Sequence, residues 1–408
     1  MSELKADTAP EWVKTLNIWT DEELHQDPYP RFAELRRSCP VAHSDTFGGY
    51  WVVSSYDAIR QVFQDPGTFS NETLTIPPFE DPLAPRIPDE CDPPEHTRYR
   101  QILASFFSPQ KAEALVPYTR ATVRRLIAAI AHEPEFEFME AVAHLLPFHV
   151  VMTMFGIPES DHQMIIDLDK SGMRDAHSNI EVRKVVQTQI KVKVAEYLTG
   201  LIEERMARAH PDTEDLLGHL VAAIYDGVRP LTLDEIVRMS VFILNAGLHT
   251  TTNVLGNTMV YLSQHPDARD ALVSDPGLIP TALEELMRFE SIVSVARTAT
   301  KDIEVGGQQV HAGDRLLLLT GSAGRDEAVF DRPDEVVFER GSSRHMMFGL
   351  GPHRCAGLHL ARMELRVALE EIHRQIPTYA GIPERPAVRA TGVERGTKEL
   401  WLRLDPGH

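Results

Sequence analysis

Apolar side chains recur at helical spacing through most of the 408-residue sequence. Between positions 28 and 37, Tyr29, Phe32 and Leu35 fall on one face of a helix. The same period predicts further helices at residues 56–63, 109–131, 141–155, 160–176, 181–207, 265–274, 280–289 and 358–375. We therefore expect a largely helical chain.

The longest helical pattern covers residues 233–264 and predicts a helix of roughly 32 residues. Such a helix would be about 48 Å long, which is enough to cross a whole domain. Its middle contains Gly247 and three consecutive threonines, at 250–252. Glycine and β-branched residues weaken the interior of a helix. This weak centre is either a tolerated defect or part of a functional site.

Short apolar or alternating runs predict strands at 49–53, 303–305, 308–310, 315–319 and 399–403. Residues 71–94 are rich in proline and acidic side chains, which predicts an ordered but irregular loop of a length often found at functional sites. Residues 325–356 are also expected to be irregular. These patterns predict a mainly α fold with small β-sheets (α+β). We expect one domain, 1–408, with a β-rich portion mainly at about 41–65 and 296–320 and a helical portion at about 95–290 and 357–376.

Composition narrows the possible partners. The formal net charge of −19 disfavours nucleic acid or an anionic membrane as a general partner. No apolar run is long enough for a membrane anchor and the first residues do not resemble a secretory signal, so we expect a cytoplasmic protein. The three cysteines, Cys39, Cys91 and Cys355, form neither a disulfide framework nor a zinc-site spacing. A cysteine that performs chemistry in this chain therefore acts alone.

Cys355 has the most informative surroundings of the three. It lies in the segment 348–357, where three glycines and a proline predict a tight turn, just before the helix expected from Leu358. A thiolate at a helix N-terminus is stabilised by the helix dipole and by free N–H groups. The alternative is a buried structural cysteine, which the run of specific residues around Cys355 disfavours.

The segment 348–357 resembles the haem-binding loop of the cytochrome P-450 superfamily. That loop reads Phe, Gly, any residue, Gly, any residue, His or Arg, any residue, Cys, any residue, Gly. The resemblance implies that Cys355 is the axial thiolate ligand of the iron of haem b, with Phe348 and Gly349 beside the cofactor. Thiolate ligation favours cleavage of the O–O bond. The resemblance also implies a triangular helical prism whose long central helix passes over the haem.

Other segments extend this resemblance over nearly the whole chain. Glu285 and Arg288 match the family's Glu-x-x-Arg, whose spacing places both charges on one helix face. Residues 330–340 look like the family's following meander, which contributes a third residue to that pair. Residues 92–100 resemble a bacterial form of the helix start near the haem. By this match, His96, Arg100, Arg297 and His353 should face the haem propionates, which as buried carboxylates need charge-assisted donors.

The middle of the long helix, residues 242–252, is similar to the family's Ala/Gly-Gly-x-acid-Thr segment. The resemblance implies that Ala246 and Gly247 leave room for O₂ and that the hydroxyl of Thr250 takes part in oxygen activation. His249 stands where the family has an acid that relays protons. Three interpretations follow: His249 is a substitute proton relay, which we favour; it forms a structural hydrogen bond; or the enzyme performs altered chemistry, such as peroxide use, reduction or a non-hydroxylating oxidation.

The resemblance also predicts the substrate site. It places Phe242, Asn245, Ala246, Val293, Val295 and Val393 near the substrate, with part of the loop 71–91. Most of these residues are apolar, which fits a small to mid-sized hydrophobic substrate. The resemblance implies that this compound is hydroxylated or O-dealkylated. Asn245 and Ser294 either bind one polar group or face away.

The resemblance implies that a monomer receives its electrons from a separate ferredoxin and ferredoxin reductase. The basic residues offered as a docking patch are Arg98, Lys111, Arg344, Arg354 and Arg362, and the alternative is that they are ordinary solvated side chains. Two other classes stay open, a peroxide-using enzyme and a haem protein that binds a ligand without turnover. Retention of Thr250 disfavours the second.

Overall fold

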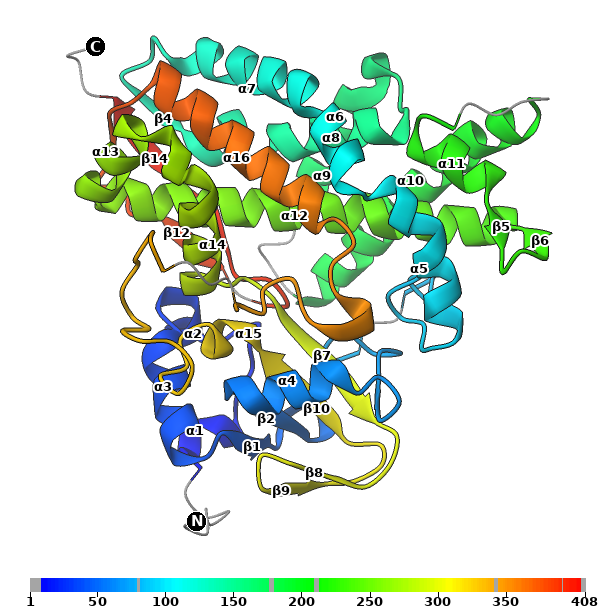
Figure 1. Ribbon diagram of the computed structural model, residues 1–408, viewed down its shortest axis with the longest axis vertical. Helices are drawn as coiled ribbons and strands as arrows, with labels where there is room; N and C mark the ends of the chain where they lie inside the picture. Colours follow the sequence, from blue (N-terminus) through cyan, green and yellow to red (C-terminus); the bar gives the residue numbers. More distant parts are fainter. Residues whose placement is uncertain are drawn as a thin grey trace.

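The computed structural model describes residues 9–78, 81–175, 180–208, 213–340, 344–390 and 392–404, without the side chains of 172–175 and 180–184. Helices dominate it, as expected (Figure 1). The helical part contains α5 (Glu95–Phe106), α6 (Pro109–Ala114), α7 (Val116–Ile130), α8 (Leu145–Phe155), α9 (His162–Asp175), α10 (Ile180–Met206), α11 (Leu216–Ala222), α12 (Leu233–Gln264), α13 (Pro266–Ser274), α14 (Ile279–Phe289) and α16 (Leu358–Gln375). No helix among the described residues is long and apolar enough to cross a bilayer.

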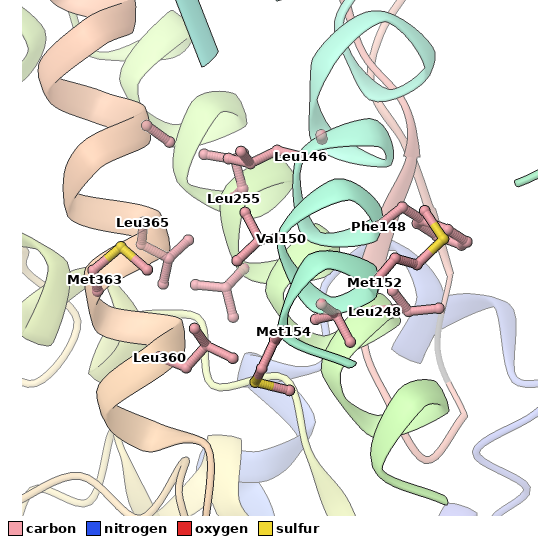
Figure 2. Close-up of a cluster of buried hydrophobic side chains, with 14 of the residues drawn as sticks. Leu146, Phe148, Val150, Met152, Met154, Leu248, Leu255, Leu360, Met363 and Leu365 are labelled. Atoms are coloured by element: carbon pink, nitrogen blue, oxygen red, sulfur yellow. The ribbon is translucent and has the colours of Figure 1, made fainter. Parts of the chain in front are cut away.

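The long helix α12 crosses the helical part from side to side (Figure 1). It begins with a capping box, in which the Thr232 hydroxyl accepts from the Glu235 backbone N–H and the Glu235 carboxylate accepts from the Thr232 backbone N–H. Figure 2 shows Leu248 and Leu255 of α12 among apolar side chains of α8 and α16, including Val150 and Leu365. Burial of this core keeps the helix continuous despite its weak centre.

The β-rich part holds a five-stranded sheet of order β1-β2-β10-β7-β3. Its strands are β1 (Val41–Ser44), β2 (Tyr50–Val53), β3 (Phe69–Ser70), β7 (Ser294–Ala299) and β10 (Arg315–Leu319), with α1 (Glu11–Lys14), α2 (Glu22–Gln26), α3 (Tyr29–Ser38), α4 (Tyr56–Gln64) and α15 (Thr320–Ala323) in the same part of the molecule (Figure 1). In β7, Arg297 pairs with Leu316 and Val295 with Leu318. Because strand side chains alternate, Val295 and Arg297 lie on one face of the sheet.

Four smaller sheets complete the fold. They pair β11 (Tyr379–Gly381) with β14 (Trp401–Leu404) and β4 (Glu135–Glu137), β12 (Val388–Ala390) with β13 (Gly396–Glu399), β5 (Ile224–Tyr225) with β6 (Arg229–Pro230), and β8 (Ile303–Val305) with β9 (Gln308–Val310). The bounds expected for α12, α16, β8, β9 and β10 are confirmed. The end of the helix expected at 160–176 lies outside the described residues.

Three expectations were wrong in detail. The helix expected at 109–131 is two helices, because Pro117 in the first turn of α7 cannot continue a preceding helix. The helix expected at 141–155 is preceded by a π-helical turn, Met139–Ala143, and restarts at Leu145. The strand expected at 399–403 is divided at Leu400, so that β13 pairs with β12 while β14 joins β11 and β4.

Candidate active site

The loop that carries Cys355 is closed by its own backbone. The N–H of Cys355 donates to the carbonyl of Phe348 over 2.8 Å, and α16 begins three residues later. Gly351 has a φ of 70°, and a Cβ atom there would lie 2.5 Å from the Phe63 carbonyl oxygen. Only glycine meets both demands. The tight turn expected before a helix at Leu358 is confirmed.

The thiol of Cys355 is accessible, yet it is densely surrounded by protein. This burial raises the pKa of Cys355, although a hydrogen bond from the Gly357 backbone and the Arg100 guanidinium act in the opposite direction. The backbone N–H at the helix terminus favours the thiolate, as expected, but desolvation outweighs it in the protein alone. Coordination to a metal ion would deprotonate the sulfur.

Four basic side chains gather near this loop. The rings of His96 and His353 lie with their centroids 3.7 Å apart, and none of their four nitrogens has a hydrogen-bond partner among the described residues. Arg100 donates to the Arg354 carbonyl over 2.7 Å, and the buried Arg297 donates to the Ala296 carbonyl over 2.7 Å. Neither arginine forms an ion pair with a described carboxylate, although Asp89 lies near enough to act on the charges of both. Within the cluster, the two imidazoles are thus buried without hydrogen-bond partners among the described residues.

Burial and mutual repulsion govern the titration of this cluster. Burial, with the charges of His96, Arg297 and Arg100, lowers the pKa of His353 to about 3. Burial lowers the pKa of His96 to about 4 and that of Arg297 to about 10. Two carboxylates of a bound group would relieve this repulsion and fill the empty acceptor positions. The residues present therefore fit a haem whose propionates meet this cluster.

The middle of α12 presents one accessible stripe. Phe242, Asn245, Ala246, His249 and Thr250 are partly or fully accessible, whereas their neighbours at 243, 244 and 248 are buried. Their spacing of three and four residues places them on one helix face. The Thr250 hydroxyl donates to the Ala246 carbonyl over 2.8 Å. This face holds the predicted oxygen and substrate residues together.

Gly247 makes a packing contact that the sequence did not reveal. A Cβ atom at this position would lie 3.1 Å from Cγ2 of Val151 on α8. The absence of a side chain therefore lets α8 approach α12 closely. Room for O₂ beside Gly247 stays a prediction.

His249 meets a carboxylate from another helix. Its Nε2 lies 3.2 Å from Oδ1 of Asp169 on α9. Sequence reasoning missed Asp169, although a signal was present. Ile165 and Ile166 are buried, and Asp169 follows at helical spacing, so a carboxylate stands on the apolar face of α9.

The three valines predicted at the substrate are brought together by backbone pairing. Val293 forms an antiparallel bridge with Glu394, and the Ser294 N–H donates to the Val393 carbonyl over 2.7 Å. Val295 follows in β7, and all three valines are half-buried. The site thus combines α12, β7 and the segment before β13.

The expected Glu-x-x-Arg pair has the predicted geometry. Arg288 donates from Nε and Nη2 to the two carboxylate oxygens of Glu285, each over 2.8 Å. Arg340 is the third residue, with Nε 2.9 Å from Glu285 Oε1. Arg288 also donates to the carbonyls of Pro333 and Glu335, which fixes the meander to α14.

The basic docking patch is partly neutralised by the chain itself. Arg98 lies 3.2 Å from Asp226, Lys111 lies 3.2 Å from Glu214, and Arg362 lies 2.6 Å from Glu284. Three of the five proposed charges therefore have internal carboxylate partners. The patch is less positive than its sequence suggests.

Comparison with known proteins decides the family. The family model for cytochrome P450 matches residues 47–275 and 277–375. The chain belongs to the cytochrome P450 family. This P450 is 32% identical over 403 residues to the methyl-branched lipid omega-hydroxylase of Mycobacterium tuberculosis, covering 95% of this chain and 92% of that protein. It is 30% identical over 398 residues to the vitamin D(3) 25-hydroxylase of Pseudonocardia autotrophica, covering 93% and 94% of the two chains.

The solved structures agree with the sequence comparison. The crystal structure of the P450 CYP101C1 superposes with a TM-score of 0.87 at 29% identity, covering 98% of this chain and 99% of that one. The predicted P450 fold is thereby confirmed. The chain is a P450 monooxygenase by family, and family membership supports a haem-thiolate cofactor.

Proposed function

We propose that this P450 binds haem b through Cys355 and hydroxylates or O-dealkylates a small to mid-sized hydrophobic compound. For hydroxylation the balance is R–H + O₂ + 2e⁻ + 2H⁺ → R–OH + H₂O. The observation that carries the cofactor assignment is the pair of buried imidazoles, His96 and His353, whose ring nitrogens have no hydrogen-bond partner among the described residues. When bound, thiolate-ligated haem iron supplies the binding of O₂ and the cleavage of its O–O bond.

The chain's own residues hold the cofactor and manage protons. His96, Arg100, Arg297 and His353 would donate to the propionates, with Phe348 and Gly349 beside the ring. Gly357 supports this placement, because a Cβ atom there would meet no atom within 4 Å.

On the opposite side, Thr250 is oriented by its hydrogen bond to the Ala246 carbonyl. We assign His249 the proton relay. Its contact with Asp169 of α9 supplies a carboxylate beside the position where the family has its acid.

Apolar side chains define the substrate class. Phe242, Val293, Val295 and Val393 offer no charge, and Asn245 is the most accessible polar residue in the middle of α12. Such a lining favours a hydrophobic compound that presents at most one polar group to Asn245. The names of the two hydroxylases cited above, which concern a methyl-branched lipid and vitamin D₃, support this class.

We assign electron delivery to a ferredoxin and its reductase, docking over Arg354 and the neighbouring basic residues. Docking of opposite charges weakens as salt increases. Turnover should therefore fall strongly between low and moderate salt. Turnover that does not depend on salt would contradict this docking surface.

The carbon monoxide difference spectrum of the reduced holoprotein tests the haem-thiolate assignment. The wild-type protein and Cys39→Ala should show the long-wavelength Soret band of a thiolate–haem–CO complex, and Cys355→Ala should lose it. Absence of the band in the wild-type protein, or its retention in Cys355→Ala, would overturn the assignment. Hydrogen peroxide supplied without a redox partner separates the peroxide-using alternative, since only that enzyme would turn over efficiently.

A further inference from the structure

His249 belongs to a polar cluster assembled from four segments. Its Nε2 lies 3.2 Å from Asp169 Oδ1 on α9. One turn further along α12, Asn253 donates to Glu394 over 2.9 Å, in the segment between β12 and β13. His144, at the N-terminus of α8, lies near enough to feel the charges of both His249 and Asp169. The cluster lies on the same face of α12 as Thr250.

The Asp169 carboxylate is largely buried, and only one of its two oxygens has a described polar contact. Its side chain is only 19% exposed, that of His249 is 29% exposed, and Oδ2 of Asp169 is buried without a hydrogen-bond partner among the described residues. One carboxylate oxygen thus contacts the imidazole while the other keeps an unused acceptor. An isolated buried acceptor costs free energy, which indicates a role beyond packing.

The protonation of the neighbouring groups makes His249 the cationic partner of the Asp169 carboxylate. Burial, aided by the charge of His249, lowers the pKa of His144 to about 4, so His144 is neutral near pH 7. Burial raises the pKa of Glu394, while His249 and the hydrogen bond from Asn253 act against it. The charge of Lys170, next to Asp169 on α9, also lowers the pKa of His144.

We propose that Asp169 is the positioning residue of the His249 proton relay, an inference that rests on the function proposed above. Asp169 Oδ1 accepts a hydrogen bond from Nε2–H of His249, which fixes the tautomer and stabilises the protonated ring. The other ring nitrogen, Nδ1, then passes a proton toward oxygen and takes up the next proton from solvent, while Nε2–H stays hydrogen-bonded to Asp169 Oδ1. The acid of the relay therefore comes from α9 and its imidazole from α12.

Titration of His249 by NMR gives a readout that does not depend on turnover. The diamagnetic ferrous–CO holoprotein is used, and His249→Gln identifies the His249 ring signals. Asp169→Asn keeps the shape but removes the charge, so the pKa of His249 should fall by about one unit. Asp169→Glu should restore most of it. Asp167→Asn, an exposed carboxylate on the same helix, is the matched control and should leave it unchanged.

The fate of oxygen distinguishes a relay from a structural ion pair. With a surrogate ferredoxin, its reductase and no substrate, O₂ leaves as hydrogen peroxide after two electrons and two protons, or as two waters after four of each. Slower proton delivery favours peroxide. In Asp169→Asn the peroxide share should rise about threefold or more, and its pH midpoint should shift downward with the pKa of His249.

Two results would overturn the inference. One is an unchanged pKa of His249 in Asp169→Asn. The other is a shifted pKa with an unchanged pH midpoint for peroxide release, since a merely structural pair would behave in this way. Both are separate from failure of the proposed function, which would appear as a missing thiolate–haem–CO band in every protein, the wild type included.

Discussion

Arg288 is the largest side chain that the described residues bury completely, at 1% exposure. Its guanidinium donates to Glu285 and to three backbone carbonyls, those of Gly324, Pro333 and Glu335. Burial by itself would raise the pKa of Glu285, but the hydrogen bonds from Arg288, the Val337 backbone and Arg340 outweigh it and lower that pKa. A buried charge of this kind is tolerated only while every partner is present.

Removal of the Arg288 guanidinium should therefore be severe. We expect Arg288→Ala to lower the free energy of unfolding by about 3–5 kcal/mol, because Glu285 and the carbonyls would stay buried without donors. Urea unfolding of the holoprotein measures this loss. Arg332→Ala, at a side chain that is 56% exposed and paired with Glu335, is the control and should cost less than about 1 kcal/mol. Equal losses in the two variants would contradict this account.

Individual residues differed in how well the sequence identified them. Local motifs identified Glu285, His96 and His353 as candidates, because the spacing of each motif can be recognised in a single sequence. Asp169 was not found, because its partner His249 is eighty positions away and nothing in the sequence links α9 to α12. Long-range pairs of this kind depend on how helices pack, which local patterns do not encode.

At the scale of elements, the Cys355 loop separates two kinds of glycine. Gly351 has a φ of 70°, and a Cβ atom there would meet the Phe63 carbonyl oxygen. Gly357 has a φ of −81°, and a Cβ atom there would meet no atom within 4 Å. We expect Gly351→Ala to destabilise the protein by about 1–3 kcal/mol through backbone strain. Gly357→Ala should leave unfolding of the haem-free chain unchanged but reduce haem retention. Thermal unfolding and haem content of both variants check this contrast, and a stable Gly351→Ala would refute it.

The loop before α5 forms polar contacts with α10 and α12. Lys191 of α10 lies 2.6 Å from Asp81, whose side chain is only 8% exposed, and Arg238 of α12 donates to the Ala84 carbonyl. Burial would raise the pKa of Asp81, but the hydrogen bond and charge of Lys191 prevail and lower it.

Loss of the Lys191 contact should loosen that loop. We expect Lys191→Ala to speed amide hydrogen exchange at residues 81–90 about fivefold, equivalent to about 1 kcal/mol. Lys193→Ala, two positions along the same helix and exposed, is the control and should leave exchange unchanged. Exchange that stays slow in Lys191→Ala would show that other contacts hold the loop.

Elements with an uninterrupted pattern were predicted closely, and those shaped by partners were not. The bounds of α12 and α16 followed from apolar spacing alone. No strand was predicted at β7, which only overlaps the β-rich portion expected at about 296–320, because Ser294 and Arg297 break its apolar pattern and its neighbours are β3 and β10. Pairing across the chain, rather than local propensity, decides such a strand.

Over the whole molecule, several histidines outside the cluster of His96 and His353 are buried in a neutral state. Burial lowers the pKa of His144, His149 and His373 to about 4 in each case. In the unfolded chain the same side chains titrate near 6.5. Between these values the unfolded state binds more protons than the folded state, so the free energy of unfolding must decrease as pH falls from about 6.5 toward 4.

This linkage predicts that the protein loses stability at pH values well above those at which ordinary carboxylates are protonated. Each imidazole that stays neutral should contribute about 1.4 kcal/mol per pH unit at most. Glu285, whose pKa is lowered, loses its stabilising effect only as pH falls below its ordinary value of 4.5. Between pH 5 and 6.5 the buried histidines lower the free energy of unfolding as pH falls, whereas the raised pKa values of the buried Glu364 and Glu394 act in the opposite direction, so a single histidine is isolated by comparing its variant with the wild-type protein. Urea unfolding of the holoprotein across that window should show a steep slope, and His373→Gln should reduce it by about 1 kcal/mol per pH unit. His132→Gln, at a side chain that is 71% exposed, should leave the slope unchanged. A slope that is equally steep in His373→Gln would mean that proton uptake on unfolding comes from other groups.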